Sequence, residues 1–358
     1  MAAGRKYWII AAVFAASGCQ QVFGLEQPRL GDAGVNDGAD AKTDPPRESS
    51  LCFGAGFPVC LVSLPTVSIV FSSARSVDTD SDAVCTPTDQ PGVCAIVATS
   101  ITFNAVITFT GSRPVVVLAT DSIIVDGMLD ASSRRGVSTG AGEWSGCGAG
   151  LSPGSGGGGA GGSLGGVGGD GGGGVGIGGT AAAVMPFGMH GGCPGQTGGG
   201  ALGGAGGHGG GAVYLIASSI QIGASGTIRA NGAGGSGGAT SAGGGGGGSG
   251  GLIGFDAMQV TNQGTVFANG GGGGEGASST GNLGDFGDDP MSATNPALGG
   301  ALSTSGGDGG AGAAGALVGG PGGTGVAGGA SGGGGGGAGV VKVFGAASLT
   351  GTVSPAPS

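Results

Sequence analysis

Reactive side chains are scarce in this sequence. Of its 358 residues, 9% are charged, 4% are aromatic and two are histidine, whereas 99 are glycine. Most glycines lie between residues 136 and 339, in tracts with few groups able to act as a nucleophile or a general base. Because glycine has no side chain, the sequence predicts that this region works through its backbone and its surface.

Positive charge is scarce as well. Eleven Lys and Arg residues stand against 21 Asp and Glu residues, which gives a formal net charge of −10. A protein that binds the phosphate backbone of a nucleic acid needs a basic surface. The charge balance therefore excludes nucleic acid as a partner.

Long apolar runs are missing too. The apolar run at residues 7–16 is too short to cross a bilayer, and no other segment is long enough. It precedes the tetrapeptide 16–19, Ala-Ser-Gly-Cys, which resembles the lipobox of bacterial lipoprotein signals. The resemblance implies that residues 1–18 are a signal peptide and that Cys19 is lipidated; a secretory signal with a chance cysteine is the alternative. Residues 19–50 would then be the lipid anchor and a polar, disordered linker.

Six further cysteines remain, and an even number in an exported chain indicates disulfides. They are Cys52, Cys60, Cys85, Cys94, Cys147 and Cys193. We expect bridges between neighbours, which join Cys52 to Cys60, Cys85 to Cys94, and Cys147 to Cys193. The alternative is a zinc site. The sequence lacks the closely spaced cysteine pairs that are typical of zinc ligands, and only His190 and His208 could add an imidazole ligand.

Residues 51–135 form a cysteine-containing region with the composition of a β protein, rich in Val, Ile, Thr and Phe that often alternate with polar residues. Its last part, 114–132, returns in altered form inside the glycine-rich region, residues 136–358. The β blocks there are 211–232, 251–270 and 339–355. Matching positions are Leu118, Leu215, Ile253 and Val343; Ile123, Ile220 and Met258; and Leu129, Ile228, Val266 and Val353. One such unit cannot bury its apolar face alone, so we expect the copies to stack.

The fold class expected from these features is all-β, with a short β-solenoid or stacked-sheet repeat core and glycine-rich inserts. The inserts are the stretches 154–179, 198–211, 232–251 and 304–339. Glycine- and serine-rich chain is usually a flexible, solvated loop. We favour polyglycine-II-like packing of extended helices with three residues per turn, because apolar residues such as Val167 and Ile177 are unexpected in a linker.

Catalysis is the alternative to a structural role, since polysaccharide lyases and hydrolases use β-solenoid scaffolds. Such an enzyme needs carboxylates or basic groups that converge in a groove. The charged residues of the repeat units instead occupy non-equivalent positions, which favours solvated surface groups. They are Asp121, Asp126, Asp130, Arg229 and Asp256. A Ser-His-Asp set would have to use His190 or His208, which lie among glycines without a nucleophile motif, so no catalytic residue is predicted.

A weak calcium motif lies at Asp78-x-Asp80-x-Asp82, where Asp89 would be the twelfth residue of the loop. Ala83 stands where an EF-hand loop has glycine, and Asp89 replaces the bidentate glutamate. Solvated acidic loops are therefore the expectation, and neither a metal nor a cofactor is predicted. Trp144 is expected to be a packing residue, because one aromatic ring does not make a carbohydrate groove.

Several features together resemble the glycine-rich lipoproteins of myxobacteria and related bacteria. They are the tetrapeptide 16–19, the Asp-, Gly- and Ala-rich linker, the β region between Cys52 and Cys94, and the block 242–251. The resemblance covers most of the chain. Because Gln20 follows Cys19, it implies an outer-membrane anchor with the protein facing the periplasm or the cell surface. We expect a structural or adhesive role without catalysis, with the membrane as one partner and cell-surface glycans or proteins as further ligands.

Overall fold

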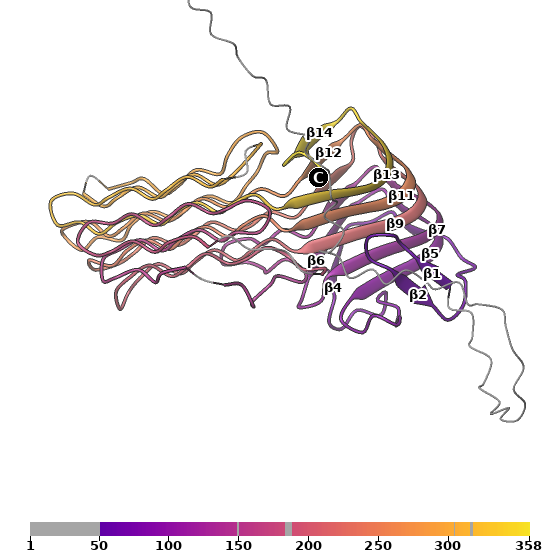
Figure 1. The fold of residues 1–358 in the computed structure, drawn as a ribbon, viewed down its shortest axis with the longest axis horizontal. Coiled ribbons are helices and arrows are strands. Elements are labelled where there is room, and N and C mark those ends of the chain that lie inside the picture. Colours follow the sequence, from indigo (N-terminus) through magenta and orange to yellow (C-terminus); the bar gives the residue numbers. More distant parts are fainter. Residues whose placement is uncertain (1–50, 149, 183–187, 304, 316–317) are drawn as a thin grey trace, which may run out of the picture. The chain divides into compact units, whose positions relative to one another are not determined.

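The computed structural model describes residues 51–358 apart from 149, 183–187, 304 and 316–317. The chain divides into two units, residues 1–47 and 48–358, and all described residues belong to the second. The predicted signal peptide, Cys19 and the linker lie outside the described residues. The described part of the chain contains no helix and consists of fourteen strands and extended glycine-rich segments (Figure 1).

Twelve of these strands form two parallel sheets of six, which confirms the all-β expectation. The first sheet has the order β13-β11-β9-β7-β5-β3 and, apart from the short edge strand β3, contains the longer strands. Its strands are β3 (Ile69–Phe71), β5 (Cys94–Phe103), β7 (Val115–Val125), β9 (Ala212–Ile222), β11 (Leu252–Asn262) and β13 (Val340–Leu349). The second sheet has the order β14-β12-β10-β8-β6-β4. Its strands are β4 (Arg75–Asp78), β6 (Val106–Thr110), β8 (Met128–Asp130), β10 (Thr227–Arg229), β12 (Thr265–Phe267) and β14 (Thr352–Ser354). Each strand of the second sheet follows one of the first along the chain, so the sheets grow together.

The main hydrophobic core lies where side chains of the two sheets meet. Phe103, Leu215 and Phe255 reach it from the first sheet, and Ile107 and Leu129 reach it from the second. All five are buried almost completely. Full burial of a side chain of this size contributes roughly 1.5–3 kcal/mol, so this contact is the main apolar stabilisation of the sheets.

The register of the short strands is the one expected from the sequence. Parallel pairing brings Leu129, Ile228, Val266 and Val353 to equivalent positions on β8, β10, β12 and β14. On the longer strands, Ile123 pairs with Ile220 as expected, but the match of Leu118 with Leu215 is wrong, because Leu118 pairs with Ile216. The register shifts between Leu118 and Ser122, which displaces the first half of β7 by one residue.

The expected matches in β11 are also wrong. Phe255, and not Ile253, pairs with Leu215, and Val260, and not Met258, pairs with Ile220. This error of two residues keeps every side chain on its own face of the sheet. Sequence alternation therefore does not reveal it.

Three disulfides join the six described cysteines in the pairs expected from the sequence. Cys52–Cys60 closes the antiparallel hairpin of β1 (Leu51–Phe53) and β2 (Val59–Leu61). Cys85–Cys94 ties a loop to the start of β5, and Cys147–Cys193 joins two glycine-rich stretches. Each bridge lowers the conformational entropy of the unfolded chain where little apolar area is available.

Buried asparagines connect successive short strands. Asn231 and Asn269 follow β10 and β12, in the repeated Ala-Asn-Gly endings. The Oδ1 of Asn231 accepts a hydrogen bond from the backbone N–H of Asn269 at 2.9 Å, and the Oδ1 of Asn269 accepts one from the hydroxyl of Ser354 at 2.7 Å. The Nδ2 of Asn269 donates to the carbonyl of Ser292 at 2.9 Å. This ladder fixes the point at which the chain leaves the sheets.

Replacement of Asn269 by alanine should destabilise the fold, because it leaves the Ser354 hydroxyl and the Ser292 carbonyl without their partner. We expect the free energy of unfolding to fall by about 1–3 kcal/mol, measured by guanidinium denaturation. The exposed Asn295→Ala is the control and should change it by less than about 0.5 kcal/mol. Equal effects of the two variants would contradict a structural role for the ladder.

Candidate functional site

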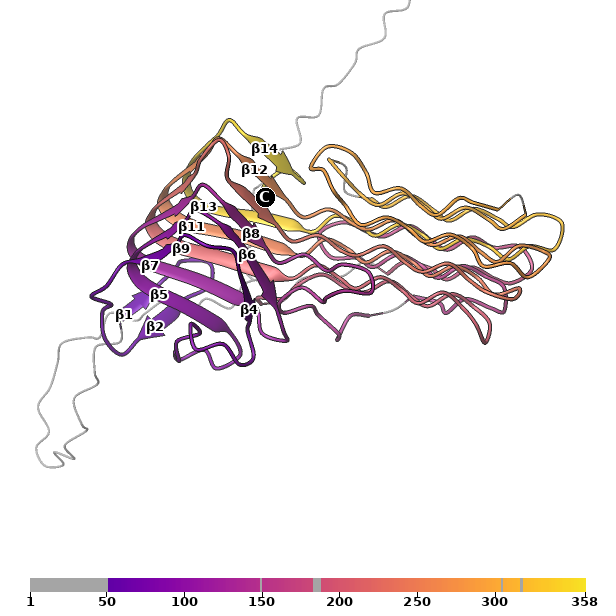
Figure 2. The ribbon, with the colours of Figure 1, turned by 180° about the vertical axis from the view of Figure 1, so that it is seen from behind.

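Glycine-rich chain leaves the sheets after three of the short strands. It spans residues 131–211 after β8, 230–251 after β10, and 268–339 after β12. These stretches turn back repeatedly and run side by side beyond one end of the strands (Figure 2). Their backbones are hydrogen-bonded to one another across large sequence separations, as from the N–H of Gly159 to the carbonyl of Gly244 at 2.9 Å. The inserts therefore form one ordered bundle.

Three stretches, termed the central segments, are 242–251, 268–277 and 329–339. Backbone hydrogen bonds link segment 242–251 to six surrounding segments. The six are 158–162, 193–199, 204–210, 233–236, 271–274 and 331–337. The backbone N–H groups of consecutive residues donate hydrogen bonds to different neighbouring segments, and every third residue donates to the same segment. Thus Gly244, Gly247 and Gly250 donate to Ser331, Gly334 and Gly337 at 2.9, 2.9 and 3.0 Å.

This packing leaves no room for side chains inside the bundle. A Cβ atom on Gly247 would overlap the carbonyl oxygen of Gly271, and one on Gly333 would overlap that of Gly245. Because the obstructing atoms belong to hydrogen-bonded backbone, they cannot rotate away. The run Ala242–Gly251, with eight glycines at 243–248, 250 and 251 around a single serine, follows directly from this close approach.

The outer segments carry side chains at every third residue. Leu202, Ala205 and His208 are exposed, whereas the glycines at 204 and 207 are buried against neighbouring backbone. The same spacing recurs at Leu283 and Phe286, and at Val318, Pro321 and Thr324, all of which are exposed. A helix with three residues per turn presents one position in three to solvent. The bundle thus combines an interior without side chains with regular outward rows.

One carboxylate lies inside a central segment. Glu275 is fully buried and accepts hydrogen bonds from the backbone N–H groups of Asp285, Leu302 and Ser303 at 2.8, 2.9 and 2.7 Å. Burial raises the pKa of Glu275, but the hydrogen bonds from Ser303, Asp285 and Leu302 outweigh it, so the pKa lies below its ordinary value. Glu275 therefore holds two outer segments onto the centre of the bundle.

The carboxylates considered for catalysis have structural partners or face solvent. Asp130 is fully buried, and its Oδ2 lies 2.7 Å from Arg229 and 2.9 Å from Arg134. Burial raises the pKa of Asp130, but Arg229 and the backbone of Ser132 more than offset this, and the pKa is lowered. A general acid requires the opposite shift. Asp121 and Asp126 are exposed on β7 and in the turn after it.

Asp256, the remaining carboxylate of the repeat units, is hydrogen-bonded to the hairpin of β1 and β2. Its Oδ2 accepts hydrogen bonds from the backbone N–H groups of Ala55 and Gly56 at 2.6 and 2.8 Å and from the hydroxyl of Tyr214 at 3.2 Å. Burial, followed by the nearby charge of Asp256, raises the pKa of Tyr214 well above its ordinary value. This carboxylate holds β1 and β2 on the outer face of the first sheet.

Each of the two histidines contacts a neighbouring side chain other than serine. The Nδ1 of His208 lies 3.0 Å from Oε2 of Glu143, which raises the pKa of His208 through hydrogen bonding and charge despite partial burial. His190 stacks on Trp144, with ring centroids 5.1 Å apart and an interplanar angle of 11°. Trp144 thus packs against a neighbour, as expected.

The calcium candidates bind protein donors. Asp78 accepts hydrogen bonds from the Ser81 hydroxyl and the N–H of Asp80, and Asp80 accepts two from Ser112. Asp82 pairs with Arg75, and Asp89 accepts the backbone N–H of Cys60 at 2.8 Å. Across the described ranges, no group of three or more His, Cys, Asp or Glu side chains is arranged to hold a metal ion.

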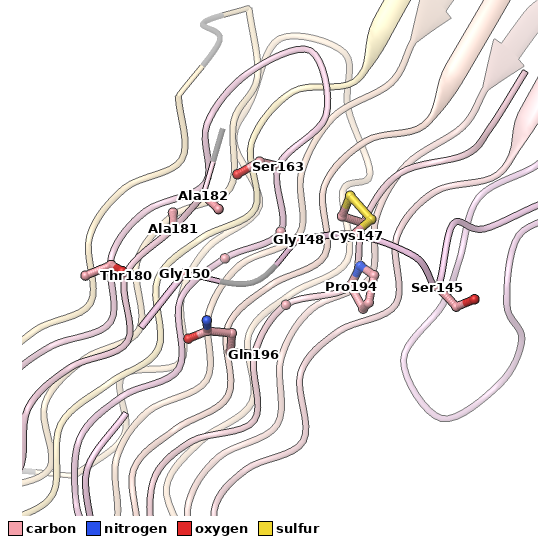
Figure 3. A pocket seen from close by; sticks show the side chains of 14 residues that line it. Ser145, Cys147, Gly148, Gly150, Ser163, Thr180, Ala181, Ala182, Pro194 and Gln196 are labelled. Carbon is pink, nitrogen blue, oxygen red and sulfur yellow. A yellow bond between two sulfur atoms is a disulfide. The ribbon is translucent and has the colours of Figure 1, made fainter. Parts of the chain in front are cut away.

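A cavity of about 190 Å³ opens beside the Cys147–Cys193 disulfide on the flank of the bundle (Figure 3). Three of its polar side chains already accept hydrogen bonds from the backbone. Gln196 accepts the N–H of Ala160 at 3.2 Å, Thr180 accepts that of Leu151 at 2.8 Å, and Ser163 accepts that of Gly168 at 2.9 Å. The described residues that line this cavity include no Asp, Glu, His, Lys or Arg and thus offer no acid–base pair.

Comparisons with protein-family models, curated proteins and solved structures found no match for this chain. Within the described residues there is no helix that is both long and apolar enough to span a bilayer.

Central glycines should not tolerate even a methyl group. We expect Gly247→Ala to lower the free energy of unfolding by about 1–3 kcal/mol or more, because the Cβ meets hydrogen-bonded backbone. Gly148→Ala is the matched control, since a Cβ there would have no atom within 4 Å. Denaturation of both variants provides the measurement, and an unchanged Gly247→Ala would contradict the close packing.

Acid should loosen the bundle through Glu275. Since the folded-state pKa is lowered, its contribution to stability is present above the unfolded-state pKa, about 4.3, and is lost as pH falls through the folded value. The wild type should therefore lose more stability between about pH 5 and pH 3 than Glu275→Gln does. The exposed Asp308→Asn serves as the control. Parallel stability curves for the wild type and Glu275→Gln would refute this role.

Proposed function

We propose that this protein is a lipid-anchored component of the bacterial cell envelope with a structural or adhesive role and without catalytic activity. In this proposal residues 1–18 are removed and Cys19 is acylated. More than one acyl chain would provide stable attachment, whereas a single chain binds only marginally. The linker then holds the folded unit away from the outer membrane, facing the periplasm or the cell surface.

For the fold itself we propose a short β-solenoid that carries a polyglycine-II-like bundle. The solenoid is supported by two parallel sheets that each gain one strand in turn. The polyglycine-II-like assignment is supported by backbone hydrogen bonds that leave successive residues in three directions. Stacking of the strand units explains why the chain repeats them, since each buries its neighbour's apolar face.

The observation that carries the functional proposal is the central segment with six hydrogen-bonded neighbours and no room for side chains. Such a body is suited to hold surface residues in fixed rows, because its interior is ordered backbone. Reactive groups are few, and the buried Asp130 and Asp256 serve as ion-pair and hydrogen-bond partners. These features support a display or scaffold role over hydrolysis or elimination on a polysaccharide.

The anchoring step can be tested in a bacterium with an outer membrane. Mass spectrometry of the mature chain should find an acylated N-terminal Cys19, and the protein should fractionate with the outer membrane. Cys19→Ser should release it to soluble fractions, whereas Cys147→Ser, which alters a disulfide cysteine, should leave it attached. An unmodified N-terminus at another residue would end the lipoprotein proposal.

The same strains test the proposed structural or adhesive role. Cells with the anchored protein should differ from cells with Cys19→Ser in adhesion to surfaces, adhesion to each other, or resistance of the envelope to detergent. Identical behaviour in all three assays would count against a structural or adhesive function.

A further inference from the structure

One side of the glycine bundle carries an exposed apolar patch. Segments 283–290 and 295–302 run next to each other there, since the N–H of Asp288 donates to the carbonyl of Leu298 at 2.8 Å. Their outward surface is termed the 283–302 face. Its exposed apolar side chains are Leu283, Phe286, Leu298 and Leu302, and Met291 is exposed in the connection between the two segments. Exposed apolar groups gathered in this way indicate an interaction site.

The face also carries two aspartates, Asp285 and Asp288, three residues apart. Along the first segment, the triplets Leu283-Gly284-Asp285 and Phe286-Gly287-Asp288 place glycine against the bundle and the apolar residue in solvent. The aspartates lie between them in sequence and are exposed or half-buried. Three residues of such a helix advance by about 9 Å. Apolar and acidic groups therefore recur together at this interval.

No lysine or arginine occurs from residue 230 to residue 341, whereas Asp285, Asp288, Asp289 and Asp308 all belong to this stretch. The chain as a whole carries a net charge of −10. A second copy that docked through the same face would bring like charges together, which is unfavourable. Arg134 and Arg229 line a small cavity with Asp289 and Met291, so positive charge lies at that end of the face. Asp285 and Asp288 form no ion pair with the described residues, and these two carboxylates favour a cationic partner.

A cationic side chain of the protein itself already uses this face. The guanidinium of Arg135 lies 4.2 Å from the centre of the Phe286 ring, and the backbone N–H of Arg135 donates to Asp289 at 3.2 Å. An aromatic ring attracts a cation above its face, and a neighbouring carboxylate adds to this attraction. Leu283 and Asp285 present a similar apolar and acidic pair one triplet further along.

We propose that the 283–302 face binds an extended cationic polypeptide in which basic and apolar side chains recur every third residue. A ligand in polyproline-II conformation has the same three-residue repeat as the segments beneath it, so its side chains stay in step with both rows. This inference rests on the proposed display function and assigns it a partner. The binding should weaken with salt because exposed charges contribute to it.

The test uses the full chain in detergent and synthetic peptides of about four Pro-Lys-Leu triplets, which favour the extended helix. Peptides of Pro-Glu-Leu and Pro-Lys-Ser triplets are the controls for charge and apolar contact. Fluorescence anisotropy should show at least about tenfold tighter binding of the Pro-Lys-Leu peptide, equivalent to roughly 1.4 kcal/mol. Equal binding of the three peptides, or none, would overturn the proposal.

Variants locate the site. Leu283→Ser with Leu298→Ser, and separately Asp285→Asn with Asp288→Asn, should each weaken Pro-Lys-Leu binding about tenfold. The matched control is Leu202→Ser with Asp170→Asn, two exposed positions on other outer segments, and it should bind like the wild type. Equal losses in the control would place the binding elsewhere. If no cationic peptide binds but the anchored protein still alters adhesion or envelope resistance, this inference fails while the proposed function stands.

Discussion

Close approach of backbones in the central segments is the constraint on which the rest of the structure depends. When a segment has hydrogen-bonded neighbours on all six sides, every position faces another main chain, so glycine is required almost throughout. The scarcity of catalytic side chains is a consequence of that packing. Side chains appear where a segment has an open side, as at Leu202 and Ala205, and so they form rows on the surface.

A glycine bundle is costly to order, since glycine loses the most backbone freedom on folding and buries little apolar area. Each hydrogen bond returns only about 0.5–1.5 kcal/mol net. The sheets offset part of this cost because their apolar core fixes the ends of every glycine stretch. Asn231 and Asn269 set the exit points, and Glu275 and the Cys147–Cys193 disulfide hold the segments to one another. The two halves of the fold are therefore interdependent.

With this arrangement, a chain that has few functional groups would still be able to bind the cationic partner that we propose. The packed backbone of the interior fixes where the surface residues lie, and the outward rows of side chains provide the groups that can contact a partner. On the 283–302 face, the Phe286 ring contacts the guanidinium of Arg135, and Asp289 accepts the backbone N–H of the same residue, at positions that the packing of the segments fixes. Recognition of this kind depends on period and charge, which matches a surface role better than a solvent-excluded active site.

The sequence by itself determined the strand composition and the register of the short strands, because these depend on neighbouring residues and on alternation. It favoured the cysteine pairs that the structure joins, but left the pairing open. It also showed that Asp130 and Asp256 share no motif. Tertiary structure alone decided the register of β7 and β11, where irregular pairing shifts a strand without changing its face. It alone revealed that β3 to β6 extend the same two sheets, and that Glu275 and the Asn269 ladder fasten the bundle. Above all, it decided which glycine segments are neighbours. A run of glycines has no sequence feature that shows which other segment it will be hydrogen-bonded to.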